Sequence, residues 1–157
     1  MITRAEEKDA ESMTDYELII RQAEQMAEDA SWDITLYANI SALIYESFDD
    51  LNWAGFYLMR DGKLHLGPFQ GKVACTVIPV GKGVCGTAVE RGEVIRVDDV
   101  HAFPGHIACD SASESEIVIP IRRNGEIIGV LDIDSPIKGR FSKEDEKALI
   151  RIAEILD

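Results

Sequence analysis

The spacing of apolar residues is helical at both ends of this chain and alternates in the middle. Apolar positions recur every three or four residues over residues 14–29, which predicts an amphipathic helix capped by Thr14 or Asp15. Its apolar stripe consists of Leu18, Ile19, Ala23, Met26 and Ala27. The same spacing predicts a second helix capped by Ser31 and a last helix capped by Ser142.

Between these helices, apolar and polar residues alternate, which predicts strands joined by tight turns. Asp61-Gly62 and Asn124-Gly125 are typical of two-residue hairpins, so two antiparallel hairpins are expected. A short helix is expected over residues 84–91. The predicted strands are residues 53–59, 64–70, 76–80, 93–97, 116–122 and 126–134. This order predicts an α+β fold whose sheet is mainly antiparallel, with the N- and C-terminal helices on one face.

Length and charge narrow the class of protein. The 157 residues are enough for one domain, expected over residues 14–157, after an acidic N-terminal arm of residues 1–13. Lys and Arg number 16 against 29 Asp and Glu, a net charge of −13, which argues against nucleic acid or an anionic membrane surface as a partner. Neither a membrane-spanning apolar run nor a secretory signal is recognisable, so a cytoplasmic location is expected.

The three cysteines are the first residues that could have a chemical role. Their odd number and the lack of any CxxC pair argue against a disulfide framework, a zinc ribbon or a thioredoxin motif. Buried, inert thiols are the ordinary interpretation. Reactive thiols are the alternative: Cys85 lies near the start of a short helix, whose dipole favours a thiolate, and Cys109 lies in a long loop, residues 98–116, of a length that is commonly functional. The residues alone do not rank Cys85 against Cys109.

The last predicted strand, IIGVLDIDS, holds carboxylates in an apolar context. Its alternation places Ile127, Leu131 and Ile133 on one face and Ile128 and Val130 on the other. Asp132 and Asp134 share the second face, and Glu116 begins the partner strand. Either the strand ends in solvent, or these three carboxylates line a pocket and face an ammonium group or a divalent metal. His101 and His106, nearby in sequence, would add metal ligands.

Four segments resemble the free methionine-(R)-sulfoxide reductases, which are single GAF-domain enzymes. They are NWAGFYL, LGPFQGKVACTVIPVGKGVCGTAV, HIACDSASESEIVIPI and GVLDIDSP, and the likeness runs from about Asp33 to the C-terminal helix. The three cysteines stand at the three cysteine positions of the family. The resemblance implies a GAF domain in which the long loop closes a pocket on the sheet face opposite the helices. It also implies reduction of free L-methionine-(R)-S-oxide to L-methionine.

The resemblance also implies roles for particular residues. Cys109 would attack the sulfoxide sulfur and become a sulfenic acid, Cys75 would resolve it as a disulfide, and Cys85 would be auxiliary. Trp53 and Tyr57 would form an apolar wall for the substrate methyl group. The three carboxylates would take the substrate ammonium and assist the sulfoxide oxygen, and backbone N–H groups of the long loop would take its carboxylate. Thioredoxin or another dithiol would supply electrons, with no cofactor and no metal, and a homodimer is expected.

Two other classes of function stay open. One is a non-enzymatic GAF sensor that binds a small molecule or reads redox state. The other is a Cys/His metal site, although the cysteine spacings fit no common zinc pattern.

Overall fold

The computed structural model describes residues 14–107, 109 and 111–157, so the expected N-terminal arm lies outside the described residues. Its six-stranded antiparallel sheet has the order β3-β2-β1-β6-β5-β4. The strands are β1 (Trp53–Arg60), β2 (Lys63–Gly71), β3 (Val77–Pro79), β4 (Ile95–Val97), β5 (Ser115–Arg123) and β6 (Glu126–Ser135). The helices are α2 (Tyr16–Asp29), α3 (Asp33–Ser47), α4 (Gly83–Arg91), the 3₁₀ turn η1 (Val100–Ala102) and α5 (Lys143–Ile155). Within the described ranges, no helix is long and apolar enough to cross a membrane.

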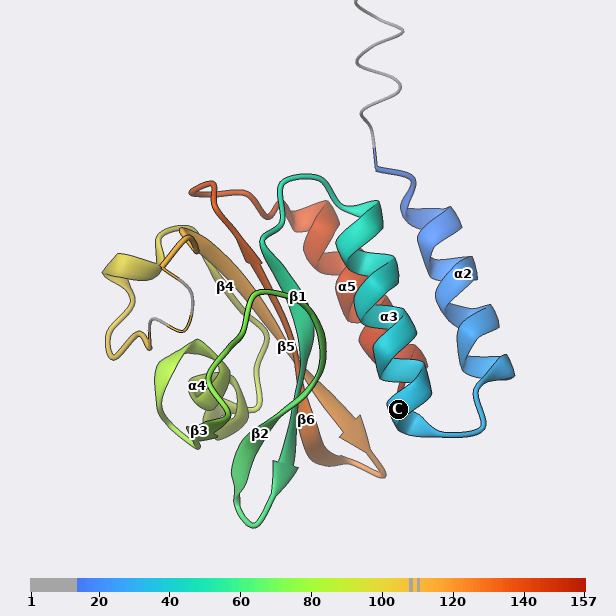
Figure 1. The fold of residues 1–157 in the computed structure, drawn as a ribbon, viewed down its shortest axis with the longest axis horizontal. Helices are drawn as coiled ribbons and strands as arrows, with labels where there is room; N and C mark the ends of the chain where they lie inside the picture. Colours follow the sequence, from blue (N-terminus) through green and yellow to red (C-terminus); the bar gives the residue numbers. More distant parts are fainter. Residues whose placement is uncertain (1–13, 108, 110) are drawn as a thin grey trace, which may run out of the picture.

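The two faces of the sheet are covered by different parts of the chain (Figure 1). Helices α2, α3 and α5 pack on one face, and α4 with the long loop lies over the other. Alternation along β1 separates the two layers: Ala54 and Phe56 join the core under the terminal helices, whereas Trp53 and Tyr57 join the cluster under α4. The predicted α+β fold with terminal helices on one face is therefore confirmed.

Both predicted hairpins are present, and their turns use the expected backbone. Asp61 and Gly62 have φ angles of 53° and 75°, and Asn124 and Gly125 have φ angles of 53° and 81°. A turn with positive φ at both central residues matches the right-handed twist of the strands that it joins. The second hairpin fixes how β5 and β6 lie against each other, and these strands carry the carboxylates.

Two local predictions about the helices are wrong. Asp15 caps α2 as expected, but Leu18 in its first turn is 45% exposed and lies off the buried stripe. Ser31 does not cap the next helix, because α3 begins at Asp33 with Trp32 in the capping position. An aspartate in the first turn complements the helix dipole there without a side-chain cap.

A bulge in β6 changes the alternation that the sequence predicted. Ile121 of β5 pairs with Gly129, whereas Arg122 pairs with Ile127, so Ile128 is an extra residue on β6. Ile128 packs against the core under the terminal helices, which is the opposite face from the one predicted. Past the bulge the alternation is regular, and Val130 faces the α4 side as predicted.

Candidate active site

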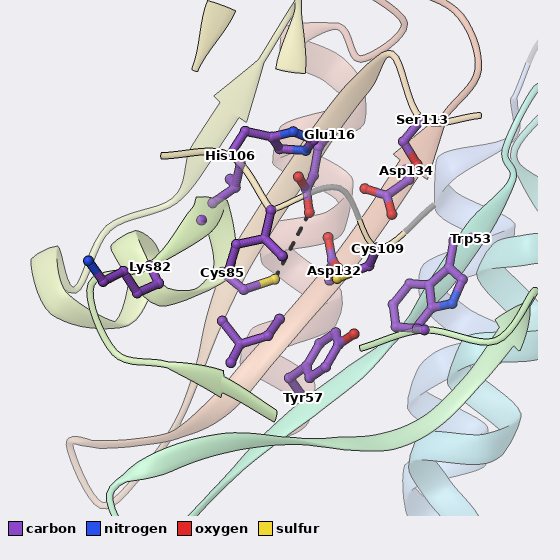
Figure 2. A pocket seen from close by; sticks show the side chains of 15 residues that line it. Trp53, Tyr57, Lys82, Cys85, His106, Cys109, Ser113, Glu116, Asp132 and Asp134 are labelled. Atoms are coloured by element: carbon purple, nitrogen blue, oxygen red, sulfur yellow. Dashed lines mark hydrogen bonds between the residues drawn. The ribbon is translucent and has the colours of Figure 1, made fainter. Parts of the chain in front are cut away.

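A pocket of about 40 Å³ lies between the sheet and α4, under the long loop (Figure 2). Every residue that the sequence singled out for chemistry lines it, except Cys75 and His101. These residues are Trp53, Tyr57, Cys85, Cys109, Glu116, Asp132 and Asp134. His106 also lines the pocket, together with Lys82 and Ser113, two polar residues that the sequence did not single out and that carry no recognisable local signal.

Strand register brings the carboxylates and one aromatic residue together. Asp134 of β6 pairs with Trp53 of β1 on one side and with Glu116 of β5 on the other. Asp132 lies two residues before Asp134 and therefore on the same face. Asp132 and Glu116 are only 5% and 7% exposed, so β6 does not end in solvent here. Of the two alternatives, the carboxylates line a pocket, and the strand does not end in solvent.

A disulfide joins Cys75 and Cys109, with 5.4 Å between their Cα atoms. Cys75 lies in the segment between β2 and β3, and Cys109 lies in the long loop. The loop thus reaches across the pocket to the segment that carries Cys75. This is the pair of cysteines that the family resemblance implied.

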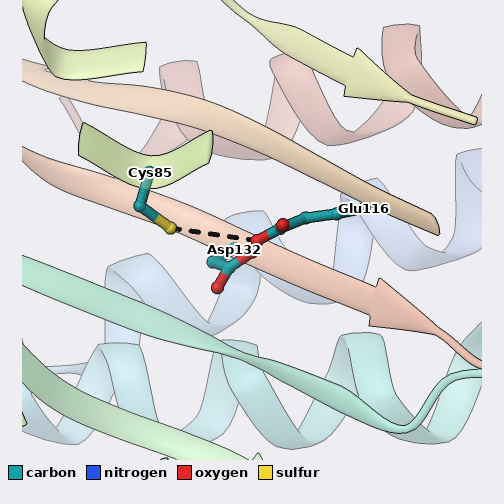
Figure 3. A group of neighbouring side chains, drawn as sticks. All are labelled: Cys85, Glu116 and Asp132. Carbon is teal, nitrogen blue, oxygen red and sulfur yellow. Dashed lines mark hydrogen bonds between the residues drawn. The ribbon is translucent and has the colours of Figure 1, made fainter. Parts of the chain in front are cut away.

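Cys85 stands apart from this pair as a buried free thiol on α4 (Figure 3). Its S–H donates to Oε2 of Glu116 across 4.0 Å. Burial, followed by the charge of Asp132, raises the pKa of Cys85 well above its usual value. The helix start does not produce a thiolate here, because burial among carboxyl groups opposes the dipole. The electrostatics therefore weigh against Cys85 as the nucleophile.

Two buried carboxyl groups of the pocket, those of Glu116 and Asp132, form a pair of proton donor and acceptor. Burial raises the pKa of Glu116 well above its usual range, and Asp132 and Asp134 raise it further. Burial also raises the pKa of Asp132, while hydrogen bonds from Glu116 and Cys85 lower it. Glu116 therefore holds the proton and Asp132 accepts it as a hydrogen bond. Oδ1 of Asp132 is buried and has no hydrogen-bond partner among the described residues.

An aromatic wall closes the β1 side of the pocket. The rings of Trp53 and Tyr57 stack with centroids 5.7 Å apart. Trp53 Nε1 donates to the carbonyl of Lys72 at 3.2 Å, and the Tyr57 hydroxyl donates to the carbonyl of Cys75 at 3.0 Å. Burial, followed by the charge of Asp132, raises the pKa of Tyr57, so this hydroxyl stays a donor. The wall therefore also holds the segment that carries Cys75.

Two groups of residues have the donor atoms of a metal site. One is Cys85, Glu116 and Asp132, and the other is Asp99, His101 and Glu114. In the second group, His101 Nε2 lies 3.1 Å from Glu114 Oε2. Lys138 lies 3.4 Å from Asp99, so a cation already neutralises that carboxylate. His106 does not belong to either group, and burial lowers its pKa. Of the two histidines that were expected as metal ligands, only His101 lies in such a group, and it is exposed.

Comparison with known proteins agrees with the fold. The family model described as GAF domain matches residues 36–156. The chain is 60% identical to the free methionine-R-sulfoxide reductase of Escherichia coli over 84% of this chain and 79% of that protein. It is 56% identical to protein YtsP of Bacillus subtilis over 97% of this chain and 94% of that protein.

A solved structure described as fRMsr of Staphylococcus aureus in complex with substrate superposes with a TM-score of 0.87. The two are 50% identical, and the match covers 92% of this chain and 94% of that chain. The chain therefore belongs to the GAF-domain family and, within it, to the free methionine-R-sulfoxide reductases.

Proposed function

We propose that this protein reduces free L-methionine-(R)-S-oxide to L-methionine, with Cys109 as the nucleophile. The observation that carries the proposal is the Cys75–Cys109 disulfide at a pocket that holds an aromatic wall and three carboxyl groups. The relatives named as reductases of this substrate support the choice of substrate. The reaction uses only cysteine thiols, so the proposal includes no cofactor.

In the first step, the Cys109 thiolate attacks the sulfoxide sulfur. The oxygen takes a proton and passes to Cys109, which leaves free methionine and a Cys109 sulfenic acid. Glu116 is the proton donor in this proposal, because burial and two neighbouring acids keep its carboxyl group protonated. In the second step, the Cys75 thiol condenses with the sulfenic acid, which releases water and forms the disulfide seen here.

The remaining groups bind the substrate. Asp132 offers the ammonium group a buried oxygen that has no hydrogen-bond partner in the described part of the chain, and Asp134 lies on the same strand face. Trp53 and Tyr57 provide the apolar surface for the methyl group. A positive ammonium next to these acids is present in free methionine sulfoxide but absent from a residue inside a peptide. A preference for the free amino acid follows from this placement.

The substrate carboxylate is assigned to backbone N–H groups of residues 107–109. In the disulfide form the N–H of Cys109 donates to the carbonyl of Ile107 at 3.1 Å. This donor becomes available to a ligand only after a local change in the loop. We therefore place carboxylate binding in the reduced form.

The deciding experiment is a single turnover without reductant. Reduced protein mixed with free methionine-(R)-sulfoxide should lose two thiols and release about one methionine per subunit. A sensor or a metal protein would release none, and that result would reject the proposal. Parallel assays with the S epimer and with a peptide-bound sulfoxide test both specificities.

Three further parts of the proposal concern the whole molecule. Residues 14–157 are proposed to form the single folded domain, which limited proteolysis would test. A homodimer is proposed, with light scattering as its test. A dithiol protein of the thioredoxin type is proposed to reduce the disulfide, because the Cys75–Cys109 bond must be reopened after each turnover.

A further inference from the structure

The segment that carries Cys75 is held in place by its carbonyl groups. Trp53 Nε1 donates to the carbonyl of Lys72, the Tyr57 hydroxyl to that of Cys75, and the N–H of Leu66 to that of Thr76. All three donors come from β1 or β2, so these carbonyls turn toward the sheet. Ala74 packs into the cluster under α4. Residues 72–76 are thus fixed along one side and are named the Cys75 strip below.

The other side of the Cys75 strip presents an exposed apolar side chain and backbone N–H groups that could bind a partner. Val73 is 89% exposed, the largest exposure among the large apolar side chains of the described residues. The backbone N–H groups of Val73, Ala74 and Cys75 donate to no group in the described part of the chain. The strip leads directly into β3, which is an edge strand of the sheet. An exposed apolar side chain beside free N–H donors is a surface to which an extended partner segment pairs.

Charge distinguishes this surface from the rest of the protein. The chain carries a net charge of −13, yet residues 62–89 contain no Asp or Glu. The same stretch contains Lys63, Lys72 and Lys82. A partner with an acidic rim would be repelled by most of this chain and attracted here.

We propose that the Cys75 strip is the docking surface for the protein reductant, a dithiol oxidoreductase with an apolar, acidic rim around its active site, and that this reductant attacks Sγ of Cys75. The inference rests on the proposed function for the need of a reductant in each cycle. The disulfide identifies the occupant of this surface, because a protein reductant must contact one of its two sulfurs. Among the two cysteines, Cys109 lines the pocket and Cys75 does not.

The choice of sulfur follows from the direction of attack. A thiolate displaces a sulfur along the S–S axis from the side opposite the leaving sulfur. Attack on Cys75 therefore comes from the side away from Cys109 and its pocket. The donor thiolate forms a bond to Cys75, the Cys75–Cys109 bond breaks, and Cys109 leaves as a thiolate. The second donor thiol then displaces Cys75, which takes up a proton, and the donor becomes a disulfide.

The first test compares a protein reductant with a small one. Val73→Asp should lower kcat/KM for thioredoxin about tenfold or more, since a central interface residue carries that much binding energy. The same variant should keep its turnover with dithiothreitol, which needs no docking surface. Leu18→Asp is the matched control, because Leu18 is also exposed but lies on α2, across the sheet. Equal kcat/KM for thioredoxin in Val73→Asp and wild type would overturn the docking surface.

The second test identifies the sulfur. A thioredoxin variant whose resolving cysteine is serine should trap a mixed disulfide with the oxidised wild-type protein, and peptide mass spectrometry should place it on Cys75. A mixed disulfide on Cys109 would overturn the assignment. This trap needs no substrate, so it does not depend on the proposed function. If that function fails, dithiothreitol-driven reduction of free methionine-(R)-sulfoxide is absent from wild type as well.

Discussion

Replacing Glu116 by glutamine should change how the stability of this protein depends on pH. Burial and neighbouring acids raise the pKa of Glu116 in the fold, whereas an unfolded glutamate titrates near about 4.3. The folded protein therefore holds one proton that the unfolded chain has released. The stabilisation from this group is complete below the unfolded pKa and is lost as the pH rises through the folded pKa.

The size of the effect follows from that one proton. Between the two pKa values, the free energy of unfolding of the wild type falls by about 1.4 kcal/mol per pH unit because of Glu116. Glutamine does not ionise, so this contribution disappears, while its amide still donates a hydrogen bond toward Asp132 as the protonated acid does. Urea unfolding of both disulfide-bonded proteins from about pH 5 to about pH 8 measures the difference in slope. If the free energy of unfolding of the two proteins changed with pH at the same slope, the reasoning would be refuted.

The same variant tests the proton donor. Loss of a general acid lowers the rate by about 10²–10⁴-fold, which single-turnover methionine release would detect. Glu114→Gln is the matched control: the substitution is the same, Glu114 lies just before β5, and its carboxylate faces His101 outside the pocket lining. The control should keep both the wild-type rate and the wild-type pH slope. A rate for Glu116→Gln equal to that of Glu114→Gln would remove Glu116 as the donor.

Three further outcomes are expected. Cys109→Ser should release no methionine, whereas Cys75→Ser should still release about one per subunit and then stop. Full release of methionine by Cys109→Ser would show that Cys109 is not the nucleophile. Tyr57→Phe removes the hydrogen bond to the Cys75 carbonyl. It should lengthen the interval between methionine release and loss of the second thiol, and an unchanged interval would contradict this positioning. The pocket of the disulfide form, about 40 Å³, holds only a few waters at about 10–15 Å³ each. Calorimetry should therefore detect free methionine sulfoxide binding to Cys109→Ser, which neither reacts nor forms the disulfide, but not to the disulfide form of the wild type, and equal affinities would contradict a closed pocket.

The elements of the fold were predictable where local chemistry decides the backbone. Asp61-Gly62 and Asn124-Gly125 adopt the positive φ angles that such turns require, and they fix both hairpins. The bulge at Ile128 was not predictable, because Ile127 and Ile128 are both apolar and the hydrophobic pattern does not mark either of them as the extra residue. Ser31 failed as a cap because capping depends on where the helix begins, and boundaries are set by packing.

The positions of the site residues were predictable where they depend on the alternation of side chains along a strand. Asp132 and Asp134 lie past the bulge, so their shared face follows from simple alternation. Glu116 joins them because the hairpin sets the register of β5 against β6. Two contacts had no sequence signal: the hydrogen bond from Tyr57 to the Cys75 carbonyl and the contact of Cys85 with Glu116. Both join residues from different elements, which only the tertiary fold brings together.

The position of the acids explains why the proposed nucleophile comes from a loop and not from α4. Three carboxyl groups on one face of the sheet raise the pKa of any acid fixed beside them, and Cys85 is fixed there by the packing of α4. A cysteine in that place remains a thiol and serves as a hydrogen-bond donor to Glu116. Cys109 belongs to the long loop, so its distance from the same acids is not set by a helix packed on the sheet. The arrangement that keeps a proton on Glu116 therefore requires that the attacking thiolate be brought to the acids by a separate segment.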